Sequence, residues 1–136
     1  MRLEFSRYAR YADDLAGITL PIKIQSGAET VALFAAIDTG ASNCLFERTQ
    51  GELLGLAIES GERKVFTTAT GRVEAFGHMV SIDSLGIQFE AMVYFFSDPW
   101  IQKNLLGRSG WLDRIRLGLV DYEQMLYLAH YGASSE

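Results

Sequence analysis

The chain has 136 residues, the usual size of a single domain. Hydrophobic residues make up 49% of it and charged residues 21%, which allows a packed core and argues against wholesale disorder. The net charge is −5 and the sequence contains no basic stripe, so we expect no nucleic-acid partner. A single cysteine excludes an internal disulfide and is compatible with a reducing compartment, so we expect a cytoplasmic protein.

The sequence shows no targeting segment and no membrane span. Its longest apolar run, VALFAAI at 31–37, is far shorter than the ~20 residues that a membrane helix needs, so we expect no membrane partner. We divide the chain into an N-terminal extension at 1–17, one domain at 18–130 and a flexible tail at 131–136.

Alternating apolar residues predict strands along most of the chain. Residues 18–24 alternate, with Pro21 favouring an edge or strand-start position, and the turn at 26–29 leads into a second, more buried strand that ends at Asp38. Further strands are expected in a hairpin within 63–82, at 85–96, and in a closing hairpin formed by 114–121 and 124–131.

Helical signals are few. Residues 47–56 can form a short helix weakened by Gly51, and residues 108–114 can form one helical turn. The opening segment 2–15 is ambiguous between helix and strand. Many short strands separated by glycine turns predict an all-β sandwich or barrel.

Asp38 is the most unusual residue of this pattern. It ends an apolar strand and enters a turn that contains Gly40, which lets the backbone approach another group closely. A carboxylate that is fixed, partly desolvated and presented at a surface suits general acid–base chemistry. Asp and Gly also occur in ordinary turns, but the buried strand before the turn and the small residues Ala41 and Ser42 after it favour a functional site.

Three segments, in order, resemble the retropepsin-like aspartic proteases, which have a single lobe per chain. IDTGAS at 37–42 resembles their active-site loop, TTATGRVEAFGH at 67–78 their flap, and NLLGRSGWLDRIRLGL at 104–119 their second signature. The resemblance covers about residues 18–128 and implies a closed, acid-protease-like β-barrel with one short helix near the C-terminal signature.

The resemblance also implies roles for individual residues. Asp38 would be the catalytic carboxylate, and Thr39 would bond to its copy across a dimer interface. The flap tip would cover a bound peptide, and the second signature would brace the catalytic loop. The implied set comprises the loop residues Thr39, Gly40, Ala41 and Ser42, the flap residues Ala69, Thr70 and Gly71, and the bracing residues Leu105, Leu106, Gly107 and Arg108. No metal or other cofactor is implied.

The chain departs from the family in its charges. Retroviral members often have acids directly after the alanine of the loop, whereas here Ser42 and Asn43 occupy those places. Arg108 therefore needs another partner, and Asp113 in the same helical segment is the candidate.

One acid-turn motif requires a second carboxylate from elsewhere. Asp13, Asp83 and Asp98 could supply it, but none lies in a comparable strand–glycine turn, so we expect a homodimer in which Asp38 meets its own copy. The predicted function is an aspartic endopeptidase that acts on a peptide or protein substrate. The alternative is a catalytically silent module of the same fold that binds peptides or dimerises.

The remaining notable residues favour structural interpretations. Cys44 is expected to be a small core residue, and His78 and His130 match no metal-ligand spacing. Trp100 and Trp111 are expected in the core or at the dimer interface.

Overall fold

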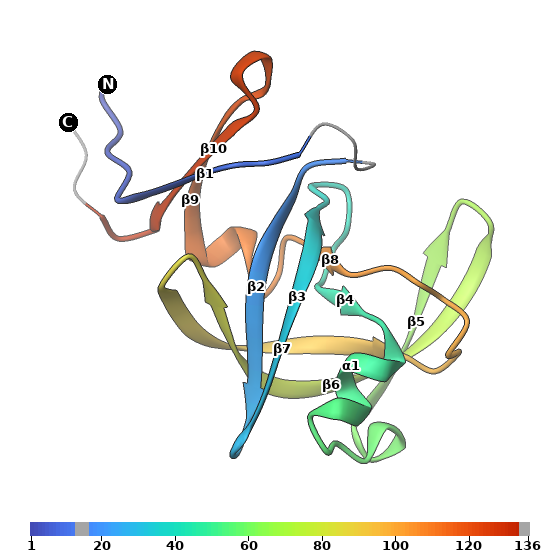
Figure 1. Ribbon diagram of the computed structural model, residues 1–136. Coiled ribbons are helices and arrows are strands. Elements are labelled where there is room, and N and C mark those ends of the chain that lie inside the picture. Colours follow the sequence, from blue (N-terminus) through green and yellow to red (C-terminus); the bar gives the residue numbers. More distant parts are fainter. Residues whose placement is uncertain (13–16, 134–136) are drawn as a thin grey trace.

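The computed structural model describes residues 1–12 and 17–133, and strands account for most of the described structure (Figure 1). The strands are β1 Arg7–Arg10, β2 Thr19–Ser26, β3 Glu29–Ile37, β4 Leu45–Phe46, β5 Glu62–Thr68, β6 Gly71–Ser84, β7 Ile87–Phe96, β8 Leu105–Leu106, β9 Ile115–Val120 and β10 Met125–His130. The helical segments are α1 Arg48–Leu53 and the 3₁₀ turns η1 Ile58–Ser60, η2 Leu112–Arg114 and η3 Asp121–Glu123. The all-β prediction is confirmed.

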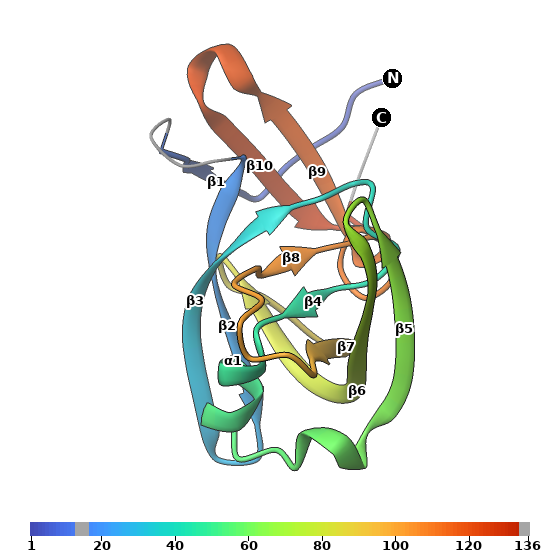
Figure 2. The same ribbon diagram turned by 90° about the vertical axis from the view of Figure 1, so that its right-hand side faces the viewer.

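The larger of the two sheets among the described residues curls back on itself. Its seven strands follow the order β2-β3-β8-β4-β7-β6-β5, and β2 also pairs with the far half of β6, with Ile22 opposite Ser84. This pairing closes a ring of strands from which β5 protrudes, so the expected barrel is present in a partly closed form (Figures 1 and 2).

The β2–β3 hairpin has the alternation predicted from its sequence. Leu20, Ile22 and Ile24 are buried on one face of β2, and burying three such side chains is worth about 5–9 kcal/mol before the entropy cost of ordering the chain. Pro21 is the third residue of β2 and pairs with Phe34 of β3, so it does not start the strand. The pairing of β2 with β6 begins only at Ile22, so Pro21 lies where this edge of β2 is open, as expected of a residue that cannot donate to a neighbouring strand.

The β6–β7 pair forms the longest ladder of the fold, from Ala75 opposite Phe96 to Ser84 opposite Ile87. The two-residue turn between them has positive φ at both positions, Leu85 (52°) and Gly86 (90°), which matches the right-handed twist of a tight hairpin. The alternating apolar residues of β7 line the core as expected, although residues on both faces are buried at the end of this strand.

A smaller three-stranded sheet of order β1-β10-β9 lies above the larger one in Figure 1. The predicted closing hairpin is β9–β10, and the ambiguous opening segment contributes the strand β1. Arg10 at the end of β1 donates to the Glu123 carbonyl at 2.8 Å, and the hydroxyl of Tyr11, the next residue, donates a hydrogen bond to Asp121. These contacts join the two ends of the chain; the division into extension, domain and tail stays a prediction.

Trp111 and Cys44 lie at the centre of the core, as expected of Cys44. Both are fully buried, and the Trp111 indole donates a hydrogen bond to the Ser84 hydroxyl at 2.9 Å. Trp100, by contrast, is 85% exposed, so a core position for it is wrong.

Within the second signature, the helical turn expected over 108–114 is the single 3₁₀ turn η2. Gly110 precedes it with φ at 103°, in a left-handed conformation that interrupts a right-handed helix. The α-helix of the described chain is α1, within the predicted 47–56 segment. None of the helices in the described chain is long and apolar enough to span a membrane.

Two short strands, β4 and β8, hold the middle of the larger sheet together. β8 runs parallel to the end of β3, with Leu106 opposite Ile37, and also pairs with β4 through Leu105 and Leu45. Directly after β8, a Cβ on Gly107 would lie 2.1 Å from the Asn43 carbonyl oxygen and 2.8 Å from that of Ala41. Both obstacles are backbone atoms, so this contact requires glycine.

We expect Gly107→Ala to destabilise the fold by about 3 kcal/mol or more, because the added methyl must push two segments of backbone apart. Urea unfolding followed by tryptophan fluorescence measures the loss. Gly132→Ala is the control, because its Cβ would meet no atom closer than 3.4 Å. A Gly107→Ala variant as stable as this control would show that the contact is looser than described.

Burial raises the pKa of the Cys44 thiol from 9.0 to about 12, although a hydrogen bond from the Gly107 amide acts in the opposite direction. We therefore expect a thiol reagent at pH 8 to modify folded protein only as fast as it unfolds. The thiol should also contribute stability that is complete below pH 9 and is lost as the pH rises towards 12. Cys44→Ala should weaken this alkaline loss; rapid labelling of the folded protein would contradict the assignment.

Candidate active site

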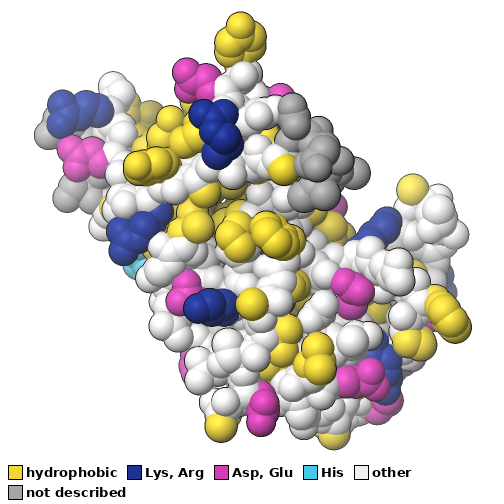
Figure 3. Space-filling model, in the orientation of Figure 1, with side chains coloured by type: hydrophobic (Ala, Val, Ile, Leu, Met, Phe, Trp, Pro, Cys, Tyr) yellow, Lys and Arg dark blue, Asp and Glu magenta, His cyan; other side chains and the backbone are white. Residues whose placement is uncertain are grey.

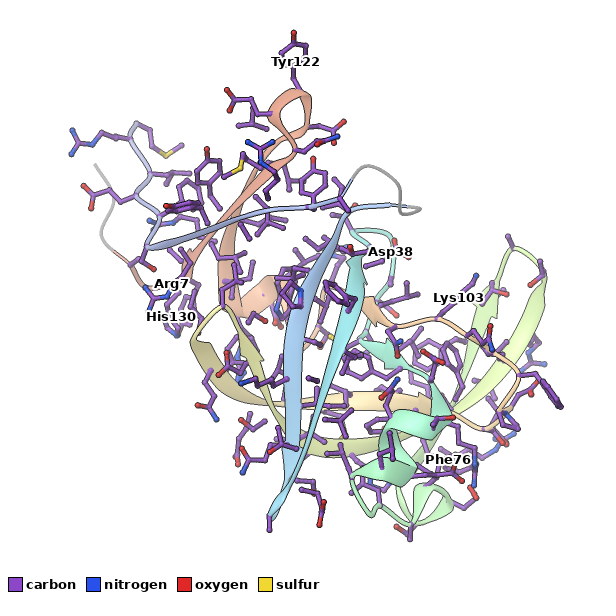
Figure 4. The ribbon with its side chains drawn as sticks, viewed as in Figure 1. Arg7, Asp38, Phe76, Lys103, Tyr122 and His130 are labelled. Carbon is purple, nitrogen blue, oxygen red and sulfur yellow. The ribbon has the colours of Figure 1, made fainter. Side chains whose placement is uncertain are left out.

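The loop that follows β3 holds Asp38 by main-chain hydrogen bonds. The Asp38 amide donates to the Leu106 carbonyl at 3.0 Å, and the Ala41 amide donates to the Asp38 carbonyl at 3.1 Å. The Gly40 amide donates to Asp38 Oδ1 at 2.9 Å. The carboxylate is therefore oriented by its own turn, at the upper end of β3 in Figure 4.

The second signature lies against this loop. The Arg108 amide donates to the Ala41 carbonyl and the Ser109 amide to the Ser42 carbonyl, both at 2.9 Å. Together with the β3–β8 pairing, these bonds place residues 105–109 alongside residues 36–42. The structure thus brings the predicted loop and the predicted bracing residues together.

Asp38 is half-buried, while Thr39 and Gly40 beside it are exposed. Within the described chain, no lysine or arginine forms an ion pair with Asp38, and its carboxylate accepts only the hydrogen bond from its own loop. A carboxylate placed in this way can still accept a proton or bind water.

The alternative second carboxylates do not join this site where they are described. Asp83 accepts a hydrogen bond from the Gly86 amide and Asp98 accepts one from the Trp100 amide, each at 2.9 Å, so both stabilise turns. Asp13 lies outside the described residues.

The predicted flap segment forms the β5–β6 hairpin. Its tip consists of Ala69 and Thr70 followed by Gly71 at φ 134°, and the Thr68 hydroxyl donates to the Gly71 carbonyl at 2.8 Å. These tip residues are exposed, and the hairpin points to the same end of the molecule as Asp38 (Figures 1 and 4).

The expected pair between Arg108 and Asp113 is not formed. Asp113 Oδ1 instead accepts a hydrogen bond from the Gly110 amide at 3.1 Å, because this bond stabilises the turn before η2. The Arg108 guanidinium is exposed, has no partner within the described ranges, and lines a shallow hollow with Ser42 and Ser109.

Lys64 and Asn43 extend the site beyond the residues expected from the sequence. Lys64 Nζ on β5 donates a hydrogen bond to Asn43 Oδ1 at 3.2 Å, which connects the hairpin to the residue directly after the Asp38 loop. The sequence of β5 shows no clear alternation, and the only available signal was the general geometry of a strand, which places Lys64 on the same face as Phe66.

The histidines have local structural roles. His78 Nε2 lies 2.9 Å from the Ile58 carbonyl oxygen, and His130 Nδ1 accepts a hydrogen bond from the Gly132 amide at 3.2 Å. The part of the chain that the structure describes contains no cluster of three metal-ligating side chains.

An apolar hollow lies on the outer face of β2 and β3, where hydrophobic side chains gather in Figure 3. Pro21, Leu33, Phe34 and Leu85 line it, and its volume is about 510 Å³. No residue of the Asp38 loop contributes to it, so it is separate from the candidate active site.

Comparisons with known proteins find similarity in structure. No protein-family model matches the sequence, and no curated protein sequence matches it. A retropepsin-like aspartic protease from Rickettsia conorii superimposes with a TM-score of 0.66 at 18% identity, covering 89% of this chain and 96% of that one. EIAV protease, solved in complex with the inhibitor HBY-793, superimposes with a TM-score of 0.55 at 20% identity, covering 71% of this chain and 86% of that one. The chain therefore has the fold of the retropepsin-like aspartic proteases.

Proposed function

We propose that the protein is an aspartic endopeptidase whose active site forms between two copies of the chain, with one Asp38 from each. The observation that carries the proposal is the position of Asp38, at the end of β3 in a loop held by main-chain hydrogen bonds and by the bond from the Gly40 amide to its carboxylate, without a cationic partner among the described residues. The similarity in fold to two aspartic proteases supports it.

Two carboxylates within hydrogen-bond distance of each other hold a single proton between them. In the proposed reaction, the ionised Asp38 takes a proton from a water molecule as the water oxygen attacks the carbonyl carbon of the scissile peptide bond. The protonated Asp38 of the other copy donates its proton to the carbonyl oxygen. The tetrahedral diol then collapses: the C–N bond breaks as one carboxyl group donates its proton to the leaving amine, and the ionised carboxylate of the other copy takes a proton from a diol hydroxyl, which restores the single shared proton.

The surface around Asp38 supports assembly of two copies. Thr39 and Gly40 are exposed, and the β9–β10 hairpin rises beyond this end of the molecule with Tyr122 at its tip (Figure 4). Tyr122 is fully exposed, and Leu119 and Val120 before it are about two-fifths exposed. An apolar projection of this kind favours burial against another chain. Arg108 lies unpaired within the described chain and is available to brace such an interface.

The β5–β6 hairpin supports the role of a flap. Its tip is exposed and it is anchored at its base through the full ladder from Glu62 opposite Gly77 to Thr68 opposite Gly71. A peptide between this hairpin and the Asp38 loop would gain strand-like main-chain bonds, and closure would exclude water from the site.

Asp38→Asn should lower the rate of peptide cleavage by at least about 10³-fold, because an amide cannot take the proton from water. Cleavage of a fluorogenic peptide mixture measures it, and circular dichroism confirms that the fold is kept. Asp83→Asn is the control, since its carboxylate serves a turn away from the loop. A wild-type protein that cuts no peptide while still binding peptides would favour the catalytically silent alternative.

Mixing experiments test whether the site needs two copies. With equal amounts of wild type and Asp38→Asn at equilibrium, random pairing leaves roughly half of the wild-type chains in wild-type dimers, so activity should fall to about half. A threefold excess of Asp38→Asn should leave about a quarter. Activity that is indifferent to added Asp38→Asn protein would contradict a shared site.

A further inference from the structure

Lys64 occupies a defined position between the candidate flap and the Asp38 loop. Its Nζ donates to Asn43 Oδ1 at 3.2 Å and lies 5.1 Å from the centre of the Phe66 ring and 5.5 Å from that of Tyr94. The two rings are buried and pack edge to face at 5.3 Å, so they form a rigid wall beneath the ammonium group.

The orientation of the side chains along β5 shows that the ammonium group of Lys64 faces the Asp38 loop and β7. Side chains alternate between the two faces of β5. The face that looks towards Tyr94 of β7 and Asn43 beside the Asp38 loop carries Glu62, Lys64 and Phe66. Arg63 lies on the opposite face of β5 and forms an ion pair with Glu74 within the hairpin. An extended peptide between hairpin and loop would therefore pass the ammonium group of Lys64 and would not meet Arg63 as a free charge.

Lys64 has no carboxylate partner among the described residues. No ion pair is formed with the one acid on its own face, Glu62, which accepts a hydrogen bond from the Tyr94 hydroxyl at 3.4 Å. Ser42, which ends the Asp38 loop, and Asn43, which follows it, are uncharged. Since an ammonium group has three N–H donors and Asn43 takes one, two remain for a ligand.

We propose that Lys64 is a specificity-determining residue that selects peptides with a glutamate or aspartate within a few residues of the scissile bond. The proposal rests on the proposed function for the location of the cleft, and it adds the chemical class of the substrate. The ammonium group is already held by Asn43 and the aromatic wall, so a carboxylate can bind it with little further loss of side-chain freedom.

A purely structural role for Lys64, joining β5 to the loop through Asn43, makes a different prediction. Lys64→Gln keeps an N–H donor for Asn43 but removes the charge. If Lys64 only joined these segments, Lys64→Gln would keep the peptide preference. Lys64→Glu, which loses the donor, would then weaken the binding of all peptides alike. If its charge selects the peptide, Lys64→Gln abolishes the preference for acids by weakening binding of Glu peptides more than binding of the matched Gln peptides.

The test measures binding, so it does not depend on catalysis. Peptide pools with a non-cleavable reduced bond carry Glu or Gln at one defined position at a time, and fluorescence anisotropy gives Kd for each pool. The proteins are wild type, Lys64→Gln, Lys64→Glu, and the control Lys23→Glu, which makes the same charge change at an exposed position on β2. Cleavage of the matching peptides with normal bonds is measured in parallel.

We expect wild type to bind the Glu pool about three- to tenfold more tightly than the Gln pool at one position or two adjacent ones, as for a partly exposed charge pair. Lys64→Gln should reduce this ratio to about one, Lys64→Glu should invert it, and Lys23→Glu should leave it unchanged. Salt at 0.5 M should reduce the wild-type ratio.

Equal binding of Glu and Gln pools at every position, pools that do not bind, or a ratio unchanged in Lys64→Glu would overturn the proposal. An acid preference that depends on Lys64 without any cleavage would uphold it while contradicting the proposed peptidase activity. Cleavage without an acid preference would contradict the role of Lys64 and support the proposed peptidase activity.

Discussion

The fold depends on the close approach of two backbone segments, the loop after β3 and the segment after β8. Gly107 lies against the carbonyl groups of Ala41 and Asn43 at a distance that admits no side chain. On either side of this contact, main-chain hydrogen bonds connect Asp38 to Leu106 and Ala41 to Arg108. Because these bonds involve backbone atoms only, most side chains around them can change without moving Asp38. Such a backbone framework is compatible with a fold shared at only 18–20% identity.

The parts of the fold that were predictable from the sequence are those built from local strand and turn signals. The β2–β3, β5–β6 and β9–β10 hairpins each join two neighbouring strand-like segments through a short turn, so their strands and partners follow from neighbouring residues. The two-residue strands β4 and β8 have no period, and their partners lie far away in the sequence. Their position in the sheet is a tertiary property. The family resemblance indicated it for β8, and nothing in the sequence indicated it for β4.

Side-chain partners were the least predictable part of the candidate site. The spacing predicted an ion pair between Arg108 and Asp113. In the structure, the Asp113 carboxylate instead accepts a hydrogen bond from the Gly110 amide, which the left-handed turn leaves available. Nothing local in the sequence connects Lys64 with Asn43, since their contact requires β5 to fold over the loop. The charge of the candidate site therefore depends on which lysine and arginine side chains remain without a partner in the folded chain. A count of acidic and basic residues does not reveal this charge.

The same reasoning applies to Asp38 and to assembly. Within one chain the carboxylate is oriented but incomplete, because the described residues offer it the Gly40 amide and no second acid. The loop beside it is exposed, and the apolar tip at Tyr122 has no cover within the described chain. If both are completed by a second copy, the free energy that buries the apolar tip also brings the two carboxylates together. Activity would then depend on protein concentration through the dimer dissociation constant, and a chain below that concentration would keep the fold without the chemistry.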